Sequence, residues 1–506
     1  MVNTVTNQMD EVYRSYYTKS DPIVKYMVTR LQLTQGLKVL EPCAGDGVFV
    51  EALNGFKKKL DIDIFDLNPA AIEVLKDKFQ SSDSITIAED DVLFSPDLQL
   101  LANAGGAYDR VIGNPPYGGW QDYDKRRHLK ALFPNLYVRE TYSLFLYHCI
   151  RLLRNNGILV FIVPDTFLNL HLHRQLREYL LTNTKILEIA LFPSSYFPGV
   201  NFGYSDLSII TCRRSHLRDE CLHNVVKIVT DFKCVNDLNN PYAEVSTHFH
   251  KQSDILGNPD HALYISGNKD VITLINKCAT RVGEIADCVT GFYSGNDKEF
   301  LRCDPDAVGK AGKYRAVDPN FTCSDLSHSK DILEGIDGPR CFVPIVKGGA
   351  VKYFKPNRWF MDWSRAAVVH YKSDKKARFQ NPSYYFRSGI GIPMVSSSSI
   401  SAAMLDCRLF DQSIVGVFPK DQALARYLLA FFNSPTCNTL IRTINPSANN
   451  PANYIKKIPY ITPNRKTLAR VNEVVESILN DLKAGSACVN KSEKKLEEVF
   501  AGLYGF

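Results

Sequence analysis

The 506-residue sequence predicts an α/β domain built on a mostly parallel sheet, followed by a mixed α+β domain. Length is the first reason, because a chain of this size exceeds a usual single domain. The second is the alternation of short apolar runs with helical periodicity between about residues 23 and 212. The third is the change after Arg213 to polar, aromatic and Pro/Gly-rich segments with few helices.

Seven strands are expected in the first domain, each a short apolar or β-branched run bounded by turn residues. They are Lys38–Glu41, Asp61–Asp66, Ile85–Ala88, Arg110–Gly113, Gly157–Val163, Ile186–Phe192 and Leu207–Cys212. Helices are expected at Pro22–Leu33, Gly47–Leu53, Pro69–Phe79, Arg139–Leu153 and Leu172–Leu181. Only a loop, Pro193–Ser205, separates the last two strands, so these should pair antiparallel.

Composition is that of a globular protein, with 45% hydrophobic and 23% charged residues. No apolar run reaches the ~18 residues that a membrane span needs, and the first residues do not resemble a signal peptide. The 13 cysteines form no CxxC pair, so we expect neither a metal site nor a disulfide framework.

The net charge of +6 is unevenly spread along the chain. Residues 1–200 hold 21 Lys+Arg and 23 Asp+Glu, which leaves 39 and 31 for residues 201–506. A cofactor-binding domain joined to a polyanion-binding domain would show this asymmetry, although a solvated basic surface explains it as well. We expect domains at 1–230 and 266–506, a linker at 231–265, and late helices at Asp421–Phe432 and Lys466–Leu482.

The first motif with chemical meaning is a strand that runs into a small-residue turn and then a helix, VLEPCAGDG at residues 39–47. Small residues let a ligand approach the backbone at the carboxyl edge of a sheet. Two carboxylates follow at the ends of the next strands, Asp66 and Asp91. A carboxylate about 20 residues after such a turn can accept both ribose hydroxyls, and a later one can accept from an adenine amino group.

The decisive motif is DRVIGNPPYG at residues 109–118. Its two prolines hold the Asn114 amide and the Pro115 carbonyl in one orientation. Both oxygens can accept from an amino group, and Tyr117 offers a flat face for stacking an extruded base. A rigid turn that caps a buried strand is the alternative, and the order of the upstream motifs disfavours it.

With these motifs in this order, residues from about Tyr17 to Cys212 resemble the catalytic domain of the amino-methylating DNA methyltransferases, in the gamma subgroup typified by the TaqI enzyme. The resemblance implies a class I S-adenosylmethionine-dependent methyltransferase fold with a Rossmann-like sheet of seven strands. Residues 266–465 are similar to the target-recognition domains of that family, and the closing LYGF resembles its usual ending.

The resemblance also implies which residues form the site. S-adenosylmethionine would be bound by Thr18, Glu41, Ala44, Gly45, Gly47, Asp66, Asp91, Asn114 and Phe145. In this assignment Thr18 or Ser20 touches the methionine part of the cofactor and Asp66 takes the ribose. Asp91 and Phe145 contact the cofactor adenine. The target base would be held by Asn114, Pro115, Tyr117 and Phe197, with Phe202 and Tyr204 as alternatives to Phe197.

The residue types predict methylation of adenine N6. The amino nitrogen is a poor nucleophile because its lone pair is delocalised into the ring. Accepting both N–H bonds at Asn114 and Pro115 favours a tetrahedral nitrogen that attacks the methyl group directly. No covalent intermediate is required, so no catalytic cysteine is expected. Enzymes that methylate cytosine N4 usually carry Ser or Asp in place of Asn114.

We therefore expect a site-specific methyltransferase that acts on double-stranded DNA, in the cytoplasm of a bacterium, associated with the nucleoid through DNA and without membrane contact. Its size fits the modification enzyme of a type II restriction system, resembling those paired with TaqI, BsuBI or PstI. The cognate endonuclease would act on the same site without an obligate complex. The alternative is an RNA or protein (glutamine) N-methyltransferase, although such enzymes commonly lack so large a C-terminal domain.

Overall fold

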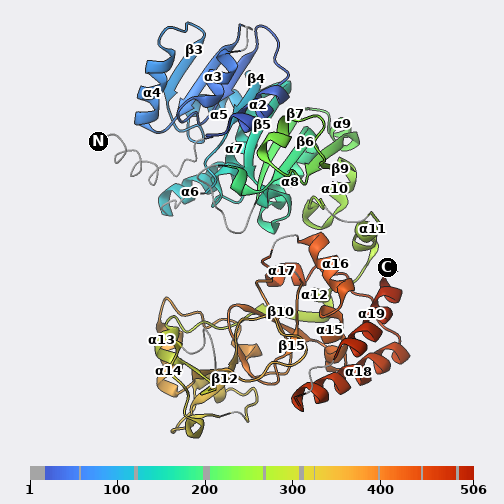
Figure 1. Cartoon of the computed structure of the whole chain (residues 1–506). Coiled ribbons are helices and arrows are strands. Elements are labelled where there is room, and N and C mark those ends of the chain that lie inside the picture. The colour runs from blue at the N-terminus through green and yellow to red at the C-terminus, as the bar shows by residue number, and fades with distance from the viewer. Residues whose placement is uncertain are drawn as a thin grey trace. The chain divides into compact units, whose positions relative to one another are not determined.

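The computed structural model describes residues 18–55, 59–118, 123–197, 206–265, 269–306, 313–323, 325–396, 399–445, 448–485 and 489–505. The chain forms two compact units, Met1–Ile265 and Ser266–Phe506, and each is described by itself (Figure 1). Among the described residues, no helix combines the length and hydropathy that crossing a membrane requires.

One mixed sheet forms the first unit, with described strands in the order β3-β2-β1-β4-β5-β7-β6-β8-β9. The first seven are β1 (Lys38–Glu41), β2 (Asp61–Asp66), β3 (Ile85–Glu89), β4 (Tyr108–Gly113), β5 (Leu153–Pro164), β6 (Thr184–Phe192) and β7 (Leu207–Arg214). Strands β1 to β5 pair in parallel, and β7 lies antiparallel between β5 and β6. The predicted α/β class and the antiparallel pairing of the last two expected strands are confirmed.

The sheet has two strands more than the seven expected. Strand β8 (Val225–Thr230) pairs in parallel with β6, and β9 (Ser246–Lys251) pairs antiparallel with β8. Segment 231–265, expected to be a linker, instead contributes β9 and the helix α10 (Gln252–Gly257) to the first unit. Edge strand β9 has no apolar run to reveal it, because its residues alternate between half-buried and exposed.

Helices pack on the sheet in two groups, as expected for a parallel sheet. The described helices of this unit besides α10 are α2 (Asp21–Arg30), α3 (Val48–Asn54), α4 (Pro69–Phe79), α5 (Pro96–Asn103), α6 (Tyr123–Leu132), α7 (Thr141–Leu152), α8 (Arg174–Asn183) and α9 (Arg218–His223). Helix α2 contacts α3, whereas α7 contacts both α5 and α8. The sequence pattern did not predict α5, α6, α9 or α10.

Local sequence explains where the site's elements begin and end. Helix α4 begins where the Asn68 side chain accepts from the backbone N–H of Ala70 and Pro69 occupies the first turn. Strand β5 is buried continuously from Gly157 to Pro164, as expected for a central strand covered by helices on both faces. These rigid elements hold the carboxyl ends of β1, β2 and β4 close together.

The second unit is mixed α+β, as expected, with two four-stranded sheets ordered β10-β17-β14-β15 and β11-β13-β12-β16. Its strands are β10 (Ala286–Thr290), β11 (Leu301–Cys303), β12 (Phe342–Val346), β13 (Trp359–Asp362), β14 (Ile390–Pro393), β15 (Ala403–Met404), β16 (Leu409–Phe410) and β17 (Ile414–Pro419). Its helices are α11 (Lys269–Lys277), α12 (Val282–Ile285), α13 (Asp297–Phe300), α14 (Arg365–Ser373), α15 (Ala425–Phe432), α16 (Pro435–Ile444), α17 (Ala452–Ile455), α18 (Arg465–Lys483) and α19 (Asn490–Tyr504). Buried aromatic rings such as Trp363 and Phe292 fill the core next to the second sheet.

Candidate active site

The turn between β1 and α3 is held by backbone hydrogen bonds to the end of β2. The N–H of Ala44 donates to the Phe65 carbonyl (3.1 Å), and that of Gly45 donates to Asp66 Oδ2 (2.8 Å). Gly47 closes the turn with a φ of +82°, and a Cβ there would lie 2.7 Å from Leu75 Cδ2. The backbone conformation and the close approach of Leu75 both favour glycine at residue 47.

The carboxylate of Asp66 already accepts hydrogen bonds from the backbone around it. Besides Gly45, its carboxylate accepts from the backbone N–H of Asn68 (2.8 Å), so it ties the end of β2 to the turn. Burial raises the pKa of Asp66, and these backbone hydrogen bonds oppose that rise.

These elements enclose a pocket at the carboxyl ends of β1, β2 and β4, with about 380 Å³ of empty space that is partly open to solvent. It is lined by Thr18, Glu41, Cys43, Ala44, Gly45, Asp46, Val48, Phe49, Asp66, Asn114 and Pro116. Six residues expected for the cofactor therefore meet here: Thr18, Glu41, Ala44, Gly45, Asp66 and Asn114.

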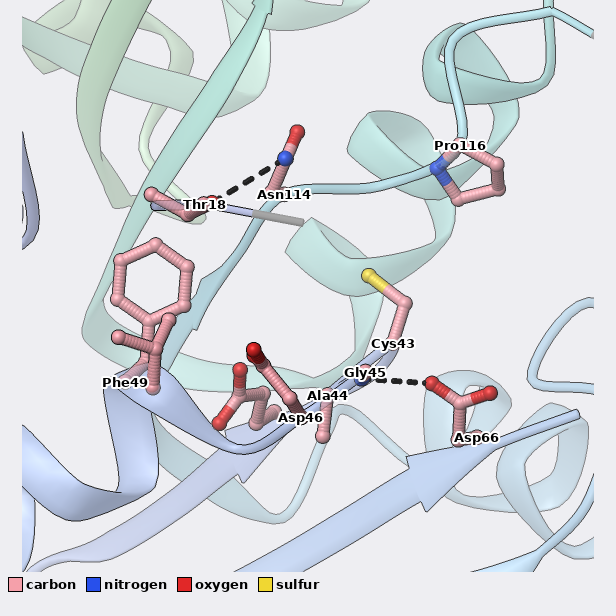
Figure 2. Close-up of a pocket in the computed structure, with 11 residues that line it drawn as sticks. Thr18, Cys43, Ala44, Gly45, Asp46, Phe49, Asp66, Asn114 and Pro116 are labelled. Carbon is pink, nitrogen blue, oxygen red and sulfur yellow. Dashed lines mark hydrogen bonds between the residues drawn. The ribbon is translucent and has the colours of Figure 1, made fainter. Parts of the chain in front are cut away.

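Asn114 follows β4 directly, and its side chain is oriented by a residue far away in the sequence. Its amide nitrogen Nδ2 donates to Thr18 Oγ1 at 3.2 Å, the upper dashed line in Figure 2. Thr18 is 4% exposed. With Nδ2 directed to Thr18, Oδ1 of the same amide is directed to the other side, where it can act as an acceptor.

The remaining expected residues do not line this pocket. Asp91 accepts from the Leu93 backbone N–H (3.1 Å) and pairs with Lys125 Nζ (3.2 Å), which anchors α6 beside it. Phe145 packs in the core of the first unit. Gly47 and Pro115 adjoin lining residues in the chain.

The two aromatic residues expected at the target base are buried in the structure. Tyr117 is 4% exposed and Phe197 is 1% exposed, and both belong to the hydrophobic core. The two alternatives to Phe197, Phe202 and Tyr204, lie outside the described residues.

Sequence reasoning missed five lining residues: Cys43, Asp46, Val48, Phe49 and Pro116. All five lie within two positions of predicted residues, so their place in the turn, the first turn of α3 or the NPPY motif was the available signal. Cys43 follows Pro42, the context expected of a cytosine-C5 nucleophile. Burial and the nearby Asp66 and Glu41 hold the pKa of its thiol well above its usual value. A raised pKa disfavours the thiolate, which is the form in which a cysteine acts as a nucleophile.

Known proteins share this N-terminal unit. Residues 18–197 match the family described as Eco57I restriction-modification methylase. The type II methyltransferase M.AccI of Acinetobacter calcoaceticus is 28% identical over 211 residues, which is 40% of this chain and 37% of that protein. The adenine-specific methyltransferase BrxX of Escherichia coli O9:H4 (strain HS) is 23% identical over 370 residues, covering 71% of this chain and 28% of that protein.

Among solved structures, a DrdV–DNA complex is similar with a TM-score of 0.53 at 12% identity, covering 94% of this chain and 58% of that chain. This likeness shows a shared fold alone, and the first unit is an α/β domain with one large mixed sheet. Four of its relatives are named as type II methyltransferases that are matched over only 34% to 54% of their own length.

Proposed function

We propose that this chain transfers the methyl group of S-adenosylmethionine to N6 of adenine in double-stranded DNA. The methylated site would be protected from a cognate restriction endonuclease, which acts without an obligate complex. The observation that carries the proposal is the convergence of Asn114, the Glu41–Gly45 turn and Asp66 on one pocket. The adenine-specific relative BrxX supports adenine as the target base. The order of the motifs supports the gamma, TaqI-like subgroup.

The lining residues fit a cationic methyl donor. Glu41, Asp46 and Asp66 contribute three carboxylates, and the described lining residues include no lysine, arginine or histidine. S-adenosylmethionine is positively charged at its sulfonium and, when bound, supplies an electrophilic methyl group. Thr18, Glu41, Ala44, Gly45 and Asp66 would hold it, and Asp91 and Phe145 would contact its adenine end.

Asn114 and Pro115 would carry the chemistry at the target base. Their two oxygens accept the amino hydrogens, which favours a nitrogen whose lone pair is available for attack. The bond from Asn114 Nδ2 to Thr18 keeps the amide oxygen, not the nitrogen, directed away from Thr18. No side chain has to form a covalent bond to the base, in agreement with the raised pKa of Cys43.

The target adenine must leave the duplex to reach such a site, because N6 is paired and stacked inside DNA. Tyr117 and Phe197 are proposed to hold the extruded base by stacking, which contributes about 1–3 kcal/mol per base. Both rings are buried, at 4% and 1% exposed, so binding the base requires them to move out of their present packing.

Residues 266–506 are proposed to recognise the DNA target. Residues 201–506, which include this unit, carry the excess of basic side chains, 39 against 31 acidic ones. Neutralising phosphates with these side chains releases counterions, so affinity should fall with salt, with a slope of roughly 0.9 per phosphate contacted.

The Asn114→Ala variant tests the proposed reaction. Because Asn114 supplies one of the two acceptors of the amino group, the variant should lose at least about a hundredfold in turnover, the effect typical of losing a transition-state hydrogen bond in a buried site. Transfer of tritiated methyl groups should be measured to DNA, RNA and protein, followed by identification of the methylated base. Asn103→Ala, at an exposed end of α5, is the matched control.

Near-normal turnover of Asn114→Ala would contradict the mechanism. Methyl transfer to RNA or protein but not to DNA would support the proposed active site but show that the substrate is RNA or protein. Methylation of cytosine N4 would correct only the target base.

A further inference from the structure

Glu41, the last residue of β1, is a buried carboxyl group that the fold does not use. Its side chain is 0% exposed, and neither carboxylate oxygen accepts a hydrogen bond of good geometry from the described residues. Asp66 next to it accepts from two backbone N–H groups. Buried polar groups are nearly always paired, so an unpaired carboxyl group in a pocket wall indicates a missing partner.

The groups around Glu41 have the wrong charge to be that partner. Asp66 at the end of β2 and Asp46 in the turn both raise its pKa by their negative charge, after burial, which is the largest cause. Only the backbone amide of Val50 on α3 favours the charged form. Lys78 of α4 is occupied, because its Nζ donates to the Asp46 carbonyl (2.6 Å) and pairs with Glu51 (2.7 Å).

A carboxyl group that is buried among like charges without a cation is held in its neutral, protonated form. A positively charged ligand reverses this balance, because an opposite charge at close range favours the ionised carboxylate. The positive charge of S-adenosylmethionine lies in its methionine half, as a sulfonium and an α-ammonium.

We propose that Glu41 is protonated in the ligand-free protein and gives up its proton when the methyl donor binds, so that its carboxylate pairs with the positive charge of the methionine half. This inference rests on the proposed function. In the exchange the O–H bond of the carboxylic acid breaks, its electron pair stays on the oxygen, and the proton passes to the buffer. In the complex, a buried pair of the Glu41 carboxylate and the positive charge of the donor replaces the neutral carboxylic acid of the ligand-free protein.

Cofactor binding is therefore coupled to pH. Since binding releases a proton, the affinity for S-adenosylmethionine rises with pH, by up to about tenfold per pH unit, until Glu41 is ionised without ligand. A neutral acid that stays neutral on binding would give no such slope.

Calorimetry of the full chain with S-adenosylmethionine tests this directly. Titrations at one pH in phosphate and in Tris differ in buffer ionisation enthalpy, so the difference in binding heat gives the number of protons released. The wild type should release roughly one proton per donor bound, the most that a single carboxyl group can supply. Glu41→Gln, which resembles the neutral acid in shape, should bind more weakly, release none and lose the pH slope.

Glu73→Gln is the matched control, because Glu73 lies on the exposed face of α4 outside the pocket, and it should behave as the wild type. Circular dichroism checks that both variants are folded.

The demethylated product, S-adenosylhomocysteine, keeps the ammonium but lacks the sulfonium. If a proton is released on binding of both the donor and the product, the Glu41 carboxylate pairs with the ammonium. If a proton is released on binding of the donor alone, it pairs with the sulfonium. Either result supports the proposal.

Binding without proton release by the folded wild type, or release that persists in Glu41→Gln, would overturn the inference and leave the proposed function standing. Failure of the folded wild type to bind the donor would overturn both.

Discussion

The hydrogen bond from Asn114 Nδ2 to Thr18 Oγ1 joins residues 96 positions apart and decides which way the amide faces. An amide presents a donor on one side and an acceptor on the other, so only one orientation suits a target that brings two hydrogens. Thr18 was expected to touch the methionine part of the cofactor. We propose that its hydrogen bond to Asn114 also makes it a positioning residue for that amide.

Replacing Thr18 with valine should separate these roles. The variant keeps the shape but loses the acceptor, so kcat should fall about fivefold to tenfold, the cost of a lost hydrogen bond of about 1–1.4 kcal/mol. Thr18→Ser should restore most of the rate because it restores the oxygen. Single-turnover rates and cofactor affinity should be measured together. A higher KM for the cofactor at unchanged kcat would show that Thr18 acts on the cofactor alone.

At the scale of elements, the turn between β1 and α3 links the pocket to the packing of α4. Gly47 begins α3 in the left-handed region, directly against Leu75 of α4. Gly36, in the loop before β1, has a similar φ of +79° but no atom within 4 Å of a built Cβ. The two glycines therefore share the backbone conformation and differ in the space around it.

Alanine substitutions at Gly36 and Gly47 should separate the cost of the left-handed backbone conformation from the cost of the steric clash with Leu75. Gly36→Ala should cost about 1–2 kcal/mol in the free energy of unfolding, because a side chain is disfavoured in the left-handed region. Gly47→Ala should cost about 1–3 kcal/mol more, since Leu75 must also shift. Urea unfolding followed by circular dichroism measures both. Equal losses would mean that α4 accommodates the extra methyl group and that the turn is not tightly packed.

At the scale of the whole molecule, the first unit extends to Ile265 because β8 and β9 continue its sheet beyond β6. The segment after residue 230 supplies β9, α10 and core residues such as Leu238, Ile255 and Leu263. Removing it would expose the long edge of β8 and part of the core, and exposed edges invite aggregation.

Two truncations should therefore behave differently. A fragment of residues 1–265 should be folded and bind S-adenosylmethionine but lose sequence-specific DNA binding, because it lacks the basic second unit. A fragment of residues 1–230 should be aggregated or unfolded. Size-exclusion chromatography, calorimetry and a DNA-binding assay over a range of salt would compare them. A stable, cofactor-binding 1–230 fragment would show that β9 and α10 are accessory, and specific methylation by residues 1–265 would refute the assignment of DNA recognition to the second unit.

Much of the fold could be predicted because its signals are local. Strands β1 and β2 and helix α4 lie at their predicted bounds, since short buried runs between turn residues are visible in the sequence itself. Strand β9 and helices α5 and α6 were missed because their apolar faces are short or half-exposed. Five of the six predicted residues that share the pocket lie at or just after strand ends, which a parallel sheet brings to one edge whatever the details of packing. The sixth, Thr18, precedes helix α2.

The sequence by itself thus determined the α/β class, the order of the motifs and the residue types gathered at the edge of the sheet. Only the tertiary structure decided that Thr18 orients Asn114, that Lys125 pairs with Asp91, and that Glu41 is buried with no charged partner among the described residues. Periodicity and turn chemistry depend on near neighbours in the chain. Hydrogen-bond partners and burial depend on segments that meet only after packing, so no local pattern specifies them.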